Sequence, residues 1–458
     1  MKTVDALIVG AATTGSYLAR RLAEQGLSVL VIDRLAKEKI GTKYDIFHIG
    51  KADFARFGLP EPAAGEDYAF SFSQSESRSS FGKHPKPGSG TVIGMHLHDY
   101  TLRMNRWAQE AGAQIVYEAA FDGLLMDEQG VIGAAYLKDG ERVLVSSSLV
   151  ADCSGIPSAA RRALPEGCAV ENFAISPEEM FYVVLRYASY HDPKDYISGS
   201  RGWTYYKTWE APQADPHGAI LGIGANLSFE TAERIYAGFE KTIDLPVHTV
   251  TRIERGTTPY RRPPYSFVAD GFAVLGDAAC LTKPSAGEGV TSSMVQADIV
   301  AEVAGNLLRR GERLTLERLW PVNVRYIQRQ GKAFASQLAM LPGAVATSAK
   351  ENDFFFEQDI IFSKRSFAAM GEGKELAFTE GEMVTMGFKM LLGVLTGRLR
   401  ISTIRALLKS VSDSGRIAKQ YDRFPATPEG FEAWKCEADE AWARCTNMAQ
   451  ALKRTLEE

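Results

Sequence analysis

The segment from Gly271 to Gly289 limits the folds open to this chain more than any other feature. An apolar run at 272–275 predicts a strand, and the glycines after it precede a new helical pattern. This order is typical of a second nucleotide-contacting element, with backbone N–H groups of 287–290 at a helix start that favours electron density on a flavin. Asp277 is expected to accept hydrogen bonds from ribityl hydroxyls. An element so far from the N-terminus indicates FAD rather than NAD. The contacts predicted here come from Gly276, Asp277, Pro284, Gly287, Gly289 and Val290.

The N-terminus predicts the first nucleotide-binding element. Apolar runs at 5–9 and 28–32 are predicted strands, and the helical pattern at 15–25 between them makes a Rossmann-type βαβ unit. The loop has the dinucleotide-binding pattern, with Ala12 where a second glycine is usual. A methyl group there should loosen or shift the pyrophosphate contact without abolishing the site at the helix N-terminus. Asp33 is expected to hold a ribose diol. The predicted contacts here are Gly10, Ala12, Gly15, Asp33 and Arg34.

A third turn follows the strand predicted at 149–153. Asp152 and Gly155 begin it, and Ser158, Arg161 and Arg162 come after them. An acidic and glycine-containing turn followed by arginines is typical of two-domain flavoproteins, which place it beneath the cofactor. The order and separation of the three elements together predict FAD binding, with Gly155 as a further contact.

The predicted fold class is α/β. Residues 1–165 and 260–310 are expected to form a discontinuous Rossmann-type FAD-binding domain. A mixed-sheet substrate and catalytic domain is expected over 166–259, where longer alternating strands are rich in Tyr and Trp, and a helical C-terminal domain over 311–458. The alternation over 70–75 and in the run after it predicts a small hairpin.

Composition excludes several classes of protein. The 458 residues, 45% of them hydrophobic, can bury a large core, and a net charge of -4 leaves no basic footprint for nucleic acid. Five cysteines without a CxxC pair imply no disulfide framework and fit a reducing compartment. His96 and His98 are the only close histidine pair, so no metal site is expected. We read no signal peptide, and expect a cytoplasmic protein.

The segment 389–411 alternates leucines with Arg398, Arg400, Arg405 and Lys409. It is too interrupted to span a bilayer, which takes about 20 apolar residues. Two interpretations fit: an amphipathic helix packed on its own protein, which we favour, or a helix at a membrane surface. A peripheral contact at the inner membrane face therefore stays open.

Several local motifs resemble the geranylgeranyl reductase family, a branch of the para-hydroxybenzoate-hydroxylase-like flavoproteins, and the resemblance runs essentially end to end. It rests on 51–60, on Pro259-Tyr-Arg261-Arg262-Pro263-Pro-Tyr265, on Gly287-Glu-Gly289, and on 421–425 leading to Trp434. The resemblance implies FAD contacts at Thr14, Asp33, Arg103, Ala120, Asp277, Gly289 and Val290. Arg103 would neutralise a phosphate, the alternative being an ordinary salt bridge.

The family's substrate motif is Tyr-x-Trp-x-Phe-Pro followed by Gly-x-Gly, and it lines the tunnel for a prenyl chain. Here Trp209 and Pro212 fit, as do Gly222 and Gly224, but Tyr206 is one residue out of register. Ala211 replaces the phenylalanine, which should widen the tunnel. The resemblance therefore implies a prenyl substrate without fixing which one. The substrate contacts implied are Tyr206, Trp209, Ala211, Pro212, Gly222 and Gly224.

Some family members carry a cysteine near the flavin, in a loop where this chain has Asp45. An acid in an apolar pocket would have a raised pKa and so donate a proton, the alternative being a loop-capping aspartate. Asp45 is thus a predicted cofactor contact as well as a candidate proton donor, with His48, Tyr206 or a bound water as the others. The expected reaction is hydride transfer from flavin N5 to an isolated double bond of a geranylgeranyl lipid, diphosphate or quinone tail. Electrons would come from NAD(P)H in transient contact or from a small redox protein, since the sequence has no further glycine-rich loop for a separate NAD(P)H domain.

Three alternatives remain. A flavin monooxygenase or halogenase shares the fold, although the halogenase pattern of two tryptophans followed by Ile-Pro is absent. A non-redox hydratase or cyclase would suit Asp45 in place of the cysteine. A lipid-binding protein without turnover would suit Ala12 and the altered aromatic motif.

Overall fold

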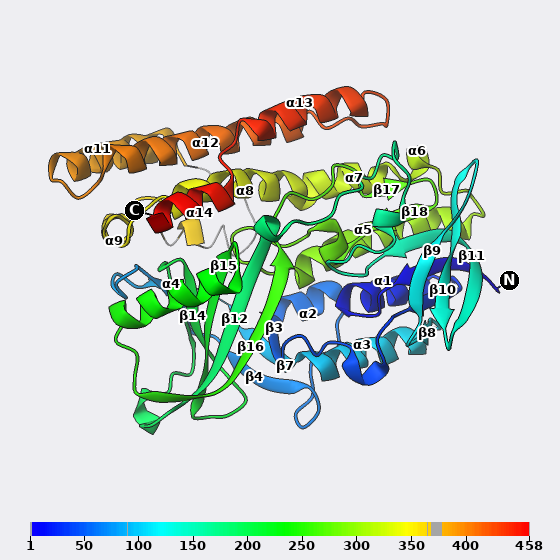
Figure 1. Ribbon diagram of the computed structural model, residues 1–458, viewed down its shortest axis with the longest axis horizontal. Helices are drawn as coiled ribbons and strands as arrows, with labels where there is room; N and C mark the ends of the chain where they lie inside the picture. The colour runs from blue at the N-terminus through cyan, green and yellow to red at the C-terminus, as the bar shows by residue number, and fades with distance from the viewer. Residues whose placement is uncertain (1, 89, 364, 368–377, 458) are drawn as a thin grey trace.

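The computed structural model describes residues 2–88, 90–363, 365–367 and 378–457. Its strands form an eight-stranded, a seven-stranded and a three-stranded sheet. Figure 1 shows the first of these at the end of the molecule near the N-terminus, the second toward the other end, and a layer of C-terminal helices lying across both.

The eight-stranded sheet has β1 (Lys2–Val9) at its centre. β11 (Glu141–Asp152) and β2 (Val29–Ile32) pair with it in parallel. The inner half of β1 is almost continuously buried, as expected of a parallel strand covered on both faces. The other strands are β8 (Gln114–Val116), β9 (Ala120–Asp127), β10 (Gly130–Lys138), β17 (Val268–Ala269) and β18 (Phe272–Val274). The predicted Rossmann-type α/β fold is confirmed.

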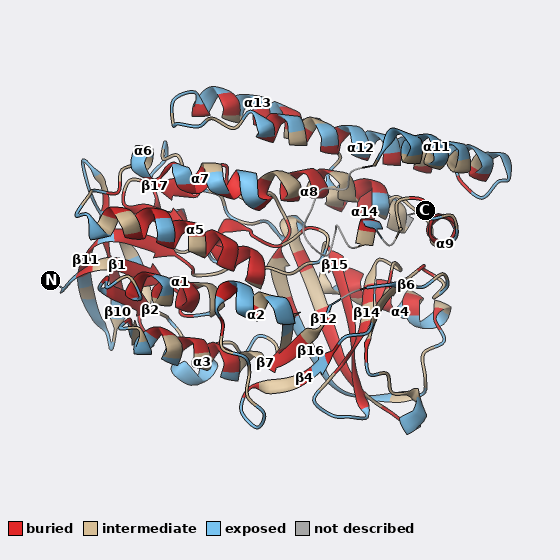
Figure 2. Ribbon diagram, turned by 180° about the vertical axis from the view of Figure 1, so that it is seen from behind, coloured by how far each residue is buried: buried red, intermediate tan, exposed pale blue. Residues whose placement is uncertain are grey.

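Helices from three parts of the chain form a layer on this sheet. α1 (Thr13–Ala23) packs between α3 (Leu97–Glu110) and α5 (Val290–Arg309). Figure 2 shows their inner faces buried. Because α1 and α5 both lead away from strand ends of the sheet, their N-termini start on the same side of it.

The seven-stranded sheet runs in the order β16, β12, β15, β14, β13, β5 and β6, and all pairs except β13 with β5 are antiparallel. α4 (Phe229–Thr242) packs on β12 and β15. The strands of this seven-stranded sheet are β16 (His248–Pro259), β12 (Met180–Tyr190), β15 (Gly218–Asn226), β14 (Lys207–Pro212), β13 (Ser200–Trp203), β5 (Ser75–Arg78) and β6 (Lys86–Pro87). The small sheet has β3 (Ile46–Gly50), β7 (Val92–His96) and β4 (Tyr68–Phe72).

The hairpin predicted over 70–75 and the run after it does not form between β4 and β5, although β5 does pair antiparallel with β6. β4 pairs with β7, whereas β5 pairs with β13 and β6. Phe70 and Phe72 are buried in a core with Ile46, which draws β4 to the small sheet, while the polar β5 extends the edge of the large one. Residues 75–87 thus join a sheet otherwise built from residues after 179, and the domain boundaries stay a prediction.

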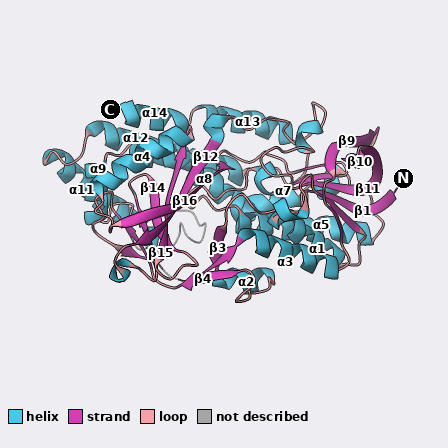
Figure 3. Cartoon of the chain, turned by 60° about the horizontal axis from the view of Figure 1, so that its bottom comes forward, coloured by secondary structure: helices cyan, strands magenta, loops and turns pink. Residues whose placement is uncertain are grey.

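The C-terminal region is helical, as predicted (Figure 3). α8 (Lys332–Val345) and α12 (Ile401–Asp422) pack along each other. Trp434 packs edge-to-face on Tyr265 at 5.2 Å between ring centroids, so the motif around Arg261 and the tail motif meet. Within the described ranges, no helix has the length and apolar character needed to cross a bilayer. The remaining helices are α2 (Lys51–Phe57), α6 (Leu316–Leu319), α7 (Pro321–Tyr326), α9 (Ala349–Glu357), α11 (Glu380–Leu395), α13 (Phe431–Ala443) and α14 (Met448–Glu457).

Candidate cofactor and substrate site

The three turns predicted from the sequence meet at the carboxyl ends of β1, β11 and β18, which are neighbours in the sheet. A Cβ on Gly10 would lie 2.3 Å from the Cys153 carbonyl oxygen. A Cβ on Gly276 would lie 3.0 Å from the Thr14 hydroxyl oxygen. Ligands of open α/β sheets bind outside these strand ends, so the fold brings all three turns to one site.

The first turn is held tightly. A Cβ on Gly15 would lie 1.8 Å from the Gly10 carbonyl oxygen, which leaves glycine as the only residue that fits. Ala12 is exposed at the N-cap of α1, and its methyl group leaves the first N–H groups of the helix without a side-chain cap. The start of α1 therefore stays open to an anion although a methyl group stands where the second glycine is usual.

Asp33 supports this turn from beneath. Its carboxylate accepts the backbone N–H of Ala11 at 2.8 Å and that of Leu35 at 2.9 Å. The Ala119 N–H in turn donates to the Asp33 carbonyl at 2.8 Å, which brings Ala120 near this turn. Arg34 is exposed beside it. The contacts of Asp33, Arg34 and Ala120 with a cofactor stay predictions.

The third turn is organised by Asp152 and Arg161. The buried Asp152 carboxylate accepts from the N–H of Ser154 at 2.9 Å and of Arg161 at 2.6 Å. The Arg161 guanidinium donates to the Ala278 carbonyl at 3.0 Å. These bonds tie the turn at Gly155, whose φ is 74°, to the turn after Gly276. Arg161 is thus a positioning residue beneath the site.

The turn after β18 leads into α5. Gly289 is the N-cap of α5, and Glu288 accepts the Thr291 N–H at 2.6 Å. Among the described residues, the N–H groups of Gly289 and Val290 have no acceptor, whereas that of Gly287 donates to Lys283 at 2.8 Å. The N–H row predicted over 287–290 is therefore shorter than expected. Burial raises the pKa of Asp277 and the nearby Glu288 raises it further, while Lys43 opposes both.

A cavity of about 1440 Å³ runs from these turns to the C-terminal helices. It is larger than the usual range of roughly 300–1,000 Å³ for one small ligand, which fits a dinucleotide and a lipid chain together. Its polar end holds 12–14, Gly155, Asp277 and 285–290. Its other end is lined by apolar residues of α8 and α14, among them Leu341, Val345, Leu452 and Leu456.

Strand β14 forms one wall of the cavity. Tyr206, Trp209 and Ala211 line it as predicted, whereas Pro212, Gly222 and Gly224 do not. A Cβ on Gly222 would lie 2.1 Å from the Trp209 ring, and one on Gly224 would lie 2.1 Å from the Phe181 ring. The two glycines therefore act indirectly, because they let both rings lie flat on the sheet.

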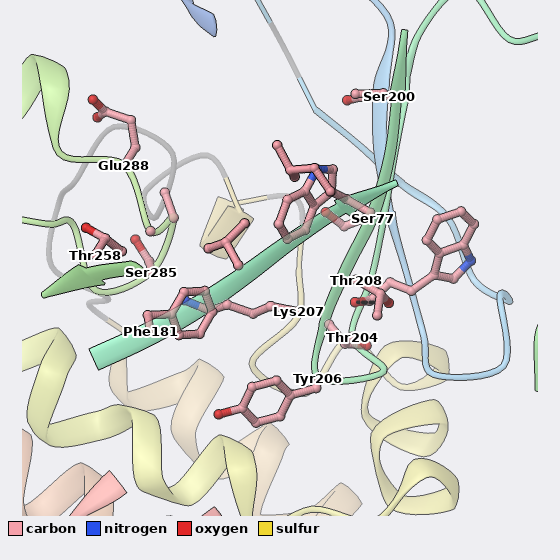
Figure 4. Close-up of a pocket in the computed structure, with 18 of the residues that line it drawn as sticks. Ser77, Phe181, Ser200, Thr204, Tyr206, Lys207, Thr208, Thr258, Ser285 and Glu288 are labelled. Carbon is pink, nitrogen blue, oxygen red and sulfur yellow. Dashed lines mark hydrogen bonds between the residues drawn. The ribbon is translucent and has the colours of Figure 1, made fainter. Parts of the chain in front are cut away.

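Lys207 is the residue of this wall that sequence reasoning missed. It occupies the position at which the family motif has tyrosine, and alternation along β14 puts it on the face of Trp209 and Ala211. Its Nζ donates to the Tyr260 hydroxyl at 2.7 Å and to the Pro284 carbonyl at 2.9 Å. Figure 4 shows the side chain extending from β14 toward Phe181 and the loop of Ser285. Burial lowers the pKa of Lys207 to about 7.

The raised pKa expected for Asp45 is wrong. Asp45 does not line the cavity in the described part of the chain. Its carboxylate pairs with His96 Nδ1 at 2.7 Å and with Arg252 at 2.7 Å. Although burial raises the pKa of Asp45, these two partners lower it below its usual value. Asp45 is a structural ion-pair residue and not a proton donor.

Arg103 also has other partners than the predicted phosphate. Its guanidinium forms a two-pronged ion pair with Asp67, at 2.5 and 2.8 Å, and contacts Glu66 at 2.8 Å. It lies outside the lining of the cavity as far as the chain is described. The salt-bridge alternative therefore describes Arg103.

His48 and Tyr206 both face the cavity. Burial lowers the pKa of His48, although Glu288 opposes this, so the neutral imidazole is disfavoured as a proton donor. The Tyr206 hydroxyl donates to Asn226 at 2.9 Å, and burial raises its pKa. Neither group matches a donor at neutral pH as well as Lys207 does. No cluster of three or more His, Cys, Asp or Glu in the described ranges is arranged to hold a metal ion.

Comparison with known proteins agrees with this geometry. Residues 3–206 match the family model described as FAD binding domain, and FAD is the cofactor. The glycine cradles and the two open helix starts fit it. The digeranylgeranylglycerophospholipid reductase of Sulfolobus acidocaldarius is 22% identical over 95% of this chain and 96% of its own. A reductase of the same name from Methanopyrus kandleri is 26% identical over 67% of this chain and 78% of its own.

Solved structures share the fold. A geranylgeranyl bacteriochlorophyll reductase-like protein from Thermoplasma acidophilum superposes with a TM-score of 0.65 at 15% identity, covering 87% of this chain and all of its own. A flavin-dependent brominase gives a TM-score of 0.60 at 17% identity, covering 87% of this chain and all of its own. The fold alone therefore does not choose between reduction and halogenation.

Proposed function

We propose that this chain, a member of the geranylgeranyl reductase family of FAD-binding flavoproteins, is an oxidoreductase that reduces isolated double bonds in the prenyl chain of a lipid. The observation that carries this proposal is the single cavity that joins the polar turns of the FAD end to an apolar end between α8 and α14. A prenyl chain has no polar atoms along its length, so it requires such a lining. The relatives named as digeranylgeranylglycerophospholipid reductases support the same substrate class.

The reduced flavin supplies a hydride when bound, and the protein must place the alkene and provide a proton. Trp209 and Phe181 form flat apolar surfaces against which an alkene packs. Lys207 stands between them and the loop of Pro284, and its pKa of about 7 suits a proton donor at neutral pH. We assign to Lys207 the role of holding that proton at Nζ.

The electron source and the cellular position belong to the same proposal. Electrons would arrive from NAD(P)H in transient contact or from a small redox protein. The protein would work at the surface of the membrane that holds its lipid. The relatives' names support a membrane lipid as substrate and leave the donor to experiment.

The test is an anaerobic single turnover. The bound flavin is reduced, geranylgeranyl diphosphate or a geranylgeranylated glycerolipid is added, and flavin reoxidation and product mass are followed. We expect reoxidation together with a gain of two hydrogens for each double bond reduced. An Ala211→Trp variant should retain the flavin spectrum but lose reoxidation, because it fills the cavity away from the FAD turns.

Each alternative has its own outcome in this assay. No reoxidation and no gain of hydrogen would contradict a reductase. Rapid reaction with oxygen and modification of an aromatic would indicate a monooxygenase or halogenase. A hydrated or cyclised product without reoxidation would indicate non-redox chemistry.

A further inference from the structure

Helix α11 carries an apolar face that the rest of the described chain leaves uncovered. Val384, Phe388 and Leu395 are 74%, 68% and 76% exposed, and Leu391 between them is 56% exposed. Their spacing puts them on one side of the helix. Figure 2 shows α11 largely exposed at one end of the molecule. The opposite side of α11 is also apolar, but it packs on a buried cluster that includes Phe354 and Leu399.

Between Val384 and Leu395 no charge interrupts the outer face. The Glu382 carboxylate turns back to accept the Thr379 N–H at 2.7 Å, and Lys389 turns inward to the Gln358 carbonyl at 2.6 Å. A surface helix that needed only water contact would carry such charges outward. Contiguous exposed apolar surface of this kind marks an interaction site.

Charges of both signs flank this face: the exposed Glu380 stands one turn before Val384, and arginines follow the helix. Arg398 and Arg400 follow α11 and are balanced by Glu357 and Glu351. Arg405, one turn into α12, is exposed and has no ion-pair partner among the described residues. An exposed apolar helix face followed in the chain by an exposed arginine, unpaired in the described ranges, matches the boundary between acyl chains and anionic headgroups.

A residue that packs with α11 lines the cavity. Phe362 lines the apolar end of the cavity and packs in the cluster that holds the inner face of α11. Arg400, at the start of α12, also lines the cavity. A bilayer against α11 would therefore lie next to the part of the cavity that Phe362 and Arg400 line.

We infer that the outer face of α11, together with Arg405, docks on the surface of an anionic lipid bilayer, and that lipid enters the cavity from this side. This inference rests on the proposed function for the identity of the lipid that enters. The docking itself depends only on the face and its charges. A second copy of the chain on this face is the competing occupant.

Vesicle co-sedimentation of the FAD-loaded protein tests the docking. Vesicles of phosphatidylcholine alone and of phosphatidylcholine mixed with phosphatidylglycerol serve as probes. We expect binding to both and stronger binding to the anionic vesicles. The double variant Phe388→Ser with Leu391→Ser should lower the bound-to-free ratio by at least about tenfold, because two large side chains leave the acyl region. Arg405→Glu should remove the preference for anionic vesicles.

The matched control is Val247→Ser with Ile253→Ser, which removes two apolar side chains, 68% and 46% exposed, at β16. We expect this control to bind as the parent does. Wild-type protein that stays in the supernatant with both vesicle types would overturn the docking, as would an unaffected α11 variant. A concentration-dependent dimer that the α11 variant abolishes, without vesicle binding, would assign the face to a second copy.

Failure of the docking and failure of the proposed function give different results. Turnover of a detergent-solubilised geranylgeranyl lipid is measured alongside, with flavin absorbance as the check on folding. Turnover without vesicle binding overturns the docking alone. Vesicle binding without turnover supports the docking and contradicts the reductase.

Discussion

Replacing Lys207 with methionine tests the electrostatics of the cavity directly. The Lys207 ammonium contacts two neutral acceptors, the Tyr260 hydroxyl and the Pro284 carbonyl, and lies 4.9 Å from the centre of the Phe181 ring. Burial alone lowers its pKa from 10.5 to about 7. Methionine keeps the length of the side chain and removes the charge, so the variant isolates the cost of a buried cation.

The magnitude follows from proton linkage. Between pH 10.5 and about 7 the unfolded chain binds a proton at Lys207 that the folded chain does not bind. The penalty on the wild type is therefore absent above pH 10.5, grows as the pH falls, and is complete below about 7. The slope is at most about 1.4 kcal/mol per pH unit. Water in the cavity screens the charge, so we expect roughly half of this slope.

The assay is equilibrium unfolding in urea at pH 7, 8 and 9, with tryptophan fluorescence as the signal. The free energy of unfolding of Lys207→Met minus that of the wild type should be larger at pH 7 than at pH 9 by about 1–3 kcal/mol. Loss of the two hydrogen bonds adds an offset that does not depend on pH. Lys350→Met, an exposed lysine on α9, is the matched control. The same difference at pH 7 and pH 9 would refute the reasoning.

Three further changes give clear expectations. Gly15→Ala should abolish FAD absorbance in the purified protein, because its Cβ would meet the Gly10 carbonyl, whereas Gly415→Ala, with open space around it on α12, should not. Gly222→Ala should lower the free energy of unfolding by about 1–3 kcal/mol, because its Cβ would displace the Trp209 ring. An unchanged midpoint of denaturant unfolding would contradict this packing. Although burial raises the pKa of Glu351, hydrogen bonds from Arg400, Ser348 and Thr403 lower it from 4.5 to about 2. Glu351→Gln should therefore lower the free energy of unfolding by on the order of 3 kcal/mol at pH 7. In denaturant unfolding this difference should fade as the pH falls from 4.5 toward 2, and a difference that stayed constant with pH would contradict the reasoning.

The turns of the FAD site were predictable because they depend on local geometry. Gly10, Gly15 and Gly276 are required by close backbone approaches or positive φ, and such requirements leave a mark at a single position of the sequence. Strand alternation was equally visible, and applied to β14 it would have placed Lys207 with Trp209 on the cavity face.

The partners of charged side chains were not predictable. Arg103 meets Asp67, and Asp45 meets Arg252, across 36 and 207 residues of sequence. Nothing local to either residue shows that a neutralising charge will be folded against it. From sequence alone, Asp45 was therefore predicted to be an unpaired acid near the flavin, and Arg103 a cation for a phosphate. The fold brings an ion-pair partner to each. The same limitation made β4 and β5 look like one hairpin.

The two ends of the cavity constrain how a lipid is presented for reduction. Lys207 contacts the Pro284 carbonyl beside the FAD turns, whereas Phe362, which packs with the inner face of α11, and Arg400 line another part of the cavity. A prenyl chain that entered from α11 would keep its headgroup near Arg400 and bring its far tail to Lys207. The double bonds nearest the headgroup would reach Lys207 only if the headgroup moved into the cavity, past the apolar lining of α8 and α14. Burying a charged headgroup there is costly, so the reductase should act first on the double bonds farthest from it.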